Sequence, residues 1–287
     1  MASFRVSDAE IHYEERGSGP TLVLVHGWPV SSVYWRSTAE ALAARYRVLT
    51  VDLPGFGLSS CVAREGATSY QQAHRLADFI RGVGGGPVFL VGHSMGGMVS
   101  ARLAAAEPAL VRKLVLVTAA LEGRTALSPV CMLARWGWAR WIATGLLGVD
   151  AARRISAPFF SYAVGVPEDV LAVAGRASPA TARLALHALT HDGDRRDLAL
   201  IACPTLAIGA DRDRIVSPLQ PLLARAWIPG ARLEVFRDCG HCPNLEYPAL
   251  FESIVTEFLD GPDATASPPP DPTAGAAAPA GSPGTAC

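Results

Sequence analysis

The sequence lacks an excess of charge of either sign and lacks long apolar runs. Its 287 residues include 25 Lys and Arg against 26 Asp and Glu, a formal net charge of −1. This balance gives no electrostatic reason to expect a nucleic acid or an anionic membrane as partner. No stretch approaches the roughly 20 apolar residues that span a bilayer, and the first residues do not resemble a secretory signal. We therefore expect a cytoplasmic protein without a membrane segment.

The sequence has six cysteines, and four of them, Cys61, Cys131, Cys203 and Cys287, are scattered as reduced thiols usually are. Cys239 and Cys242 form the one C-x-x-C pair, which resembles a redox motif. Such a motif needs a helix N-terminus, whereas Pro243 and Pro248 follow here and indicate a loop. The histidine between the two cysteines is the better functional candidate. No histidine or cysteine spacing is typical of a metal site, so we expect neither a metal nor a cofactor.

Eight short segments predict the strands of an α/β fold: the first two form a short N-terminal hairpin, and the other six are largely apolar and alternate with segments of helical pattern. They cover residues 4–6, 11–14, 21–25, 47–51, 88–91, 113–118, 205–208 and 232–236. Continuous apolar strands that alternate with helices indicate a mostly parallel eight-stranded sheet with helices on both faces. We assign residues 1–119 and 201–260 to this core. Ligands of such sheets bind at the carboxyl ends of the strands.

Two segments break this alternation. Residues 120–200 are mostly helical in pattern and contain no strong strand, which predicts a helical cap inserted over the carboxyl edge. Its Trp136, Trp138 and Trp141 either line a substrate pocket or pack the cap onto the core. Residues 261–287 are rich in Pro, Ala and Gly and contain no aromatic residue, Leu, Ile or Val. This composition predicts a disordered tail that folding does not need.

A serine stands at the apex of a predicted strand–turn–helix unit. The apolar segment 88–91 runs into Gly92-His93-Ser94-Met95-Gly96, and a helical pattern follows to residue 107. A nucleophilic serine in such a turn has a strained backbone, and the residues two before and two after it must be nearly free of side chain. The pattern also occurs in ordinary glycine-rich turns. We interpret Ser94 as the nucleophile and the amide of Met95 as an oxyanion donor.

A serine nucleophile needs a base, and the base needs an acid that orients it. His241 follows the last predicted strand and is the only histidine after His191, so it is the candidate base. Asp211 and Asp213 both lie in the loop after segment 205–208. We favour Asp213 because an apolar Ile-Val pair anchors the loop beyond it, and we keep Asp211 as the alternative acid.

Four motifs together carry a family resemblance. They are HGWP at His26, DxPGFG at Asp52, GHSMGG at Gly92 and GHxPxxExP at Gly240. In this combination, over roughly residues 4–259, the chain resembles the cap-bearing serine hydrolases of the α/β-hydrolase superfamily. The resemblance implies that the amide of Trp28 is the second oxyanion donor. It also implies an acid three residues after a glycine, where this chain has Arg212, so the choice between the two aspartates stays open.

The expected activity is hydrolysis of a carboxylic ester through an acyl-enzyme, on a small or medium-sized apolar acyl substrate. Ser94 argues for acyl chemistry, because epoxide hydrolases and haloalkane dehalogenases of this fold carry an aspartate at the elbow. A C–C bond hydrolase, a thioesterase, a lactonase or a haloperoxidase-type perhydrolase uses the same triad, and a non-catalytic ligand-binding protein can keep the same fold. The sequence does not indicate the oligomeric state.

Overall fold

The computed structural model describes residues 2–61, 68–122, 136, 167–172, 179–193 and 195–263, and all eight expected strands lie in one sheet. The strands are β1 (Ala2–Val6), β2 (Ala9–Arg16), β3 (Thr21–Val25), β4 (Arg47–Val51), β6 (Val88–His93), β7 (Val111–Val117), β8 (Thr205–Ala210) and β9 (Arg232–Phe236). Their order is β1-β2-β4-β3-β6-β7-β8-β9, and a short β5 (Ser60–Cys61) pairs with β2. β1, β2 and β4 pair antiparallel, and the pairs from β4 to β9 are parallel. The predicted fold class is confirmed.

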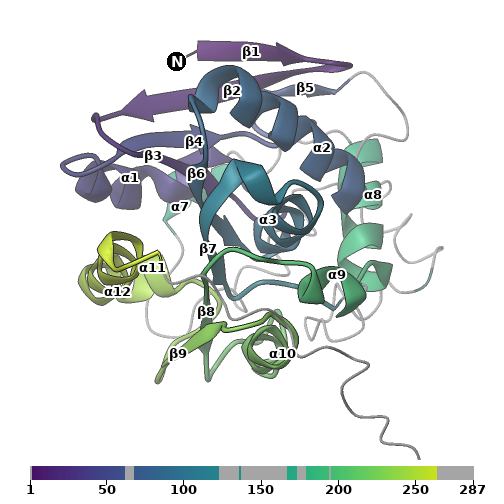
Figure 1. Ribbon diagram of the computed structural model, residues 1–287. Helices are drawn as coiled ribbons and strands as arrows, with labels where there is room; N and C mark the ends of the chain where they lie inside the picture. The colour runs from purple at the N-terminus through teal and green to yellow at the C-terminus, as the bar shows by residue number, and fades with distance from the viewer. Residues whose placement is uncertain are drawn as a thin grey trace, which may run out of the picture.

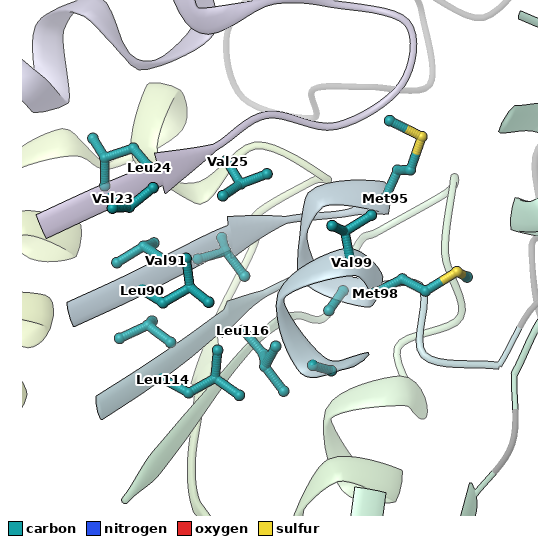
Figure 2. Close-up of a cluster of buried hydrophobic side chains, with 14 of the residues drawn as sticks. Val23, Leu24, Val25, Leu90, Val91, Met95, Met98, Val99, Leu114 and Leu116 are labelled. Atoms are coloured by element: carbon teal, nitrogen blue, oxygen red, sulfur yellow. The ribbon is translucent and has the colours of Figure 1, made fainter. Parts of the chain in front are cut away.

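The central strands are apolar because both faces of the sheet are covered. Every residue of β6 and β8 is buried, which is why these strands read as continuous apolar runs rather than as alternating ones. Figure 2 shows side chains of β3, β6 and β7 gathered beside α3 (Met95–Ala106). Val25 pairs with both Val51 and Gly92, and His93 pairs with Val117. The carboxyl ends of four neighbouring strands therefore meet at one edge.

Helices cover both faces (Figure 1). α1 (Arg36–Leu42) and α12 (Pro248–Asp260) pack together on one face, and α2 (Ser69–Phe79), α3 and α10 (Gln220–Trp227) lie on the other. The remaining described helical elements are η1 (Ser32–Trp35), η2 (Ile80–Gly84), η3 (Pro108–Leu110), α7 (Glu168–Ala172), α8 (Pro179–His191), α9 (Arg195–Ala199) and α11 (Pro243–Glu246). None of the described helices is long and apolar enough to cross a membrane.

The division into core, cap and tail stays a prediction. Among the described residues of 120–200 lie the helices α7, α8 and α9, and Arg102 of α3 joins this segment through an ion pair with Asp197 of α9 (2.7 Å). Trp138 and Trp141, like residues 264–287 of the expected tail, lie outside the described residues. Trp136 is described, and 64% of its surface is exposed.

A buried lysine joins the centre of the sheet to the last helix. The ammonium group of Lys113, on β7, donates to the carbonyls of Phe258 (3.0 Å), Leu259 (3.0 Å) and Gly261 (2.6 Å). The last carbonyls of a helix have no partner inside it and carry partial negative charge. Lys113, with 1% of its side chain exposed, therefore caps the C-terminal end of α12 from inside the core.

Replacing Lys113 by methionine should lower the free energy of unfolding by about 2–3 kcal/mol, because the buried carbonyls lose a charged donor. The neighbouring Arg112 supplies the matched control, since it pairs with Asp263 (2.8 Å) at the surface and 48% of its side chain is exposed. Arg112→Met should cost no more than about 1 kcal/mol. Urea denaturation followed by circular dichroism measures both values, and equal losses would contradict the capping role.

Candidate active site

The turn at Ser94 is shaped by close contacts between backbone segments. Ser94 has φ 54° and ψ −115°, between the end of β6 and the start of α3. A Cβ on Gly92 would lie far inside contact distance of the Gly96 carbonyl, and a Cβ on Gly96 would overlap the carbonyl oxygens of Val25 and His26. Any side chain at either position would push the helix away from the sheet. The two glycines therefore permit the strained backbone conformation of Ser94.

The candidate base and one candidate acid are in contact at the same edge of the sheet. Nδ1 of His241 lies 2.7 Å from Oδ2 of Asp213, and both residues are buried. The other oxygen of Asp213 accepts the amides of Ile215 (2.8 Å) and Val216 (3.0 Å). With Nδ1 donating to the carboxylate, Nε2 is the nitrogen of the neutral ring that can accept a proton.

Asp211 lies elsewhere. It is exposed, and its Oδ1 accepts the amide of Cys239 at 3.4 Å. The pairing between β8 and β9 continues past the strands, since the amide of Asp211 donates to Phe236 O (3.1 Å) and that of Arg212 to Cys239 O (2.9 Å). The loop therefore turns toward His241 one residue later than the family spacing implies. Of the two candidate acids, Asp213 is the one that contacts the ring of His241, and its role as the acid stays a prediction.

A buried glutamate holds the loop of His241. Both carboxylate oxygens of Glu246 accept the amide of Gly240 (3.0 Å each), and Oε1 lies 3.4 Å from the amide of Cys242. The amides on either side of His241 are thus bound to one side chain. The GHxPxxExP motif contains Glu246, but the motif alone does not reveal this role. Burial raises the pKa of the Cys242 thiol well above its ordinary value, which disfavours the reactive thiolate.

The segments that carry the two expected oxyanion donors adjoin Ser94. Met95 is the first residue of α3, where backbone amides have no partner inside the helix and the helix dipole favours negative charge. The Trp28 loop lies against the nucleophile, because a Cβ on the preceding Gly27 would lie 2.9 Å from Cβ of Ser94. His26 braces this loop: its Nε2 accepts the amide of Leu53 (3.0 Å), so Nδ1 carries the proton and donates to Gly27 O (2.8 Å).

Two further predictions concern the substrate pocket and a metal. The pocket role of the three tryptophans stays a prediction, because only Trp136 is described. Among the described residues, no three His, Cys, Asp or Glu side chains group together as metal ligands.

The family model described as the alpha/beta hydrolase family matches residues 22–254. The chain belongs to this family. It is 33% identical over 265 residues to the pimeloyl-(acyl-carrier protein) methyl ester esterase of Nitrosomonas europaea, covering 85% of this chain and 98% of that protein. It is 28% identical over 271 residues to the 2-hydroxy-6-oxononadienedioate/2-hydroxy-6-oxononatrienedioate hydrolase 1 of Dechloromonas aromatica, covering 88% and 91%.

A solved structure shares the fold. The thermophilic esterase from Thermogutta terrifontis superposes with a TM-score of 0.76 at 24% identity, covering 90% of this chain and 98% of that one. The family and both relatives confirm the predicted superfamily. The family and the relative from Nitrosomonas europaea confirm the predicted class of enzyme, a carboxylic-ester hydrolase on the α/β-hydrolase fold.

Asp213→Asn should lower kcat/KM for an ester by about 10⁴-fold, because the amide no longer favours the imidazolium form of His241. Asp211→Asn is the matched control, since it makes the same change in the same loop at an exposed position; we expect a loss of no more than about threefold. Steady-state hydrolysis of one chromogenic ester measures both variants. Equal losses, or the reverse order, would show that Asp213 is not the acid.

Proposed function

We propose that the protein hydrolyses carboxylic esters through an acyl-enzyme formed on Ser94, with His241 as base and Asp213 as acid. The observation that carries this proposal is the 2.7 Å contact between His241 Nδ1 and Asp213 Oδ2, at the sheet edge where Ser94 has a strained backbone. A serine in a strained turn beside a buried histidine–carboxylate pair is the arrangement that activates a hydroxyl for nucleophilic attack.

In the proposed first half-reaction, Oγ of Ser94 attacks the ester carbonyl and Nε2 of His241 takes the hydroxyl proton. Asp213 stabilises the resulting imidazolium. The amides of Met95 and Trp28 donate to the oxyanion as the carbonyl oxygen gains charge. Collapse of the tetrahedral intermediate breaks the C–O bond, and His241 gives its proton to the departing alcohol. Water, activated by His241, then attacks the acyl-enzyme and releases the acid.

We further propose a small-molecule substrate with an apolar acyl group, bound beneath a cap formed by residues 120–200, in a protein of the cytoplasm. Two side chains of α3 close to Ser94 in the chain support an apolar acyl site, since Met95 and Met98 are apolar and buried. A second candidate is cleavage of a C–C bond by the same triad. It is favoured by one observation, the 28% identity to the hydrolase of Dechloromonas aromatica over 88% of this chain.

Hydrolysis of p-nitrophenyl acyl esters of increasing chain length tests the proposal. We expect turnover, with an optimum length that measures the acyl site. Ser94→Ala should lower kcat by about 10⁶-fold, because no other group replaces the nucleophile. A fluorophosphonate probe should label the wild-type protein at Ser94 and should not label the variant.

The other outcomes separate the alternatives. A folded protein that labels with the probe but does not hydrolyse these esters would favour a C–C hydrolase, a thioesterase or a lactonase. Absence of both turnover and labelling would contradict the proposed function and favour a non-catalytic ligand-binding protein.

A further inference from the structure

We propose that His93 and Thr118 are positioning residues that hold the base His241 by its main-chain carbonyl, an inference that rests on the proposed function. The carbonyl oxygen of His241 accepts two side-chain hydrogen bonds, from Nε2 of His93 and from Oγ1 of Thr118, each 2.9 Å long. All three residues are buried. We call this pair of donors the carbonyl clamp.

Thr118 has a backbone conformation that its side chain disfavours. It follows β7 directly and has φ 40°, a region in which a β-branched residue is rare. Its amide still donates to Ile208 O (2.8 Å), so the distortion comes after the last sheet hydrogen bond. Strain of this kind persists where the surrounding structure requires it, often at functional sites. Here the strained turn accompanies a hydroxyl that donates to the carbonyl of the base.

The surroundings of His93 favour the neutral ring with its proton on Nε2. Its Nε2 donates to the His241 carbonyl, so Nδ1 is the nitrogen without a proton. Nδ1 is buried and has no hydrogen-bond partner among the described residues, and a Cβ on Gly27 would lie 2.9 Å from it. A second ring proton would therefore find no acceptor there. Burial, together with the neighbouring His241, lowers the pKa of His93 well below its ordinary value, which keeps it from competing for the proton that His241 takes.

The clamp links the base directly to the nucleophile. His93 precedes Ser94 in the chain, and its ring stacks on Tyr34 with centroids 4.4 Å apart. Thr118 follows Val117, whose carbonyl accepts the amide of Ser94 (2.9 Å). His93 thus adjoins Ser94 itself, and Thr118 adjoins the residue that binds the amide of Ser94. Asp213 sets the rotation of the imidazole ring, whereas the clamp sets where the main chain of His241 lies relative to the serine.

Thr118→Val tests the clamp, with Thr118→Ser as the matched variant. Valine keeps the branched shape and the backbone strain but removes the donor. We expect kcat for p-nitrophenyl ester hydrolysis to fall by about 10- to 100-fold, because a misplaced base slows proton transfer, while KM changes by no more than about twofold. Serine retains the hydroxyl and should bring kcat back to within about threefold of wild type. The rate of Ser94 labelling by a fluorophosphonate should fall in parallel with kcat.

A second donor variant makes the test independent of Thr118. His93→Phe keeps an aromatic ring for stacking and removes the donor, so it should also lower kcat. Because both donors act on one carbonyl, the double variant should lose less than the product of the two single losses. Urea denaturation checks that each variant is folded under the assay conditions.

The outcomes separate the two proposals. Equal kcat values for Thr118→Val and Thr118→Ser in an active background would overturn the carbonyl clamp alone, as would a rise in KM at unchanged kcat. A folded wild-type protein that neither hydrolyses esters nor labels would overturn the proposed function, and the clamp with it.

Discussion

The close approach of three backbone segments around Ser94 is the constraint on which the rest of the site depends. The carbonyls at the end of β3 and the first turn of α3 meet where Gly96 has no side chain, and the carbonyl of Gly96 meets Gly92 in the same way. The strained conformation of Ser94 costs about 1–3 kcal/mol. Two backbone hydrogen bonds maintain this conformation. The amide of Ser94 donates to Val117 O (2.9 Å), and the carbonyl of Ser94 accepts the amide of Ala120 (3.1 Å).

The parallel sheet converts this local constraint into a site. Because β3, β6, β7 and β8 are parallel and end at one edge, the loops that directly follow these strands lie beside one another. The loop of His241 is the exception, since it extends five residues beyond β9 and needs its own support. Glu246 binds the amides on either side of the histidine, and Asp213 contacts its ring. Such support from neighbouring groups is what a preorganised base requires.

The fold and the strained turn at Ser94 could be predicted well from the sequence because both depend on local patterns, whereas the role of Ser94 as nucleophile stays a prediction. A continuous apolar run predicts a strand buried on both faces, and the spacing of Gly92 and Gly96 around Ser94 follows from steric exclusion alone. Which aspartate contacts His241 is harder to predict, because it depends on how far the pairing of β8 with β9 continues past the strands. The roles of Glu246 and Thr118 depend on contacts between distant segments, and no local pattern signals a threonine with positive φ.

Strain in this protein is concentrated where the strands meet the site. Within the residues that the structure describes, the three non-glycine residues with positive φ are Ser94, Thr118 and Asp238. Each follows the end of a strand at the carboxyl edge: β6, β7 and β9. A sheet edge that ended in relaxed turns would let its loops diverge, whereas sharp turns bring the serine, the clamp and the base loop toward one point. The buried apolar strands behind them provide the stability that offsets this strain, which is why the core and the site must be explained together.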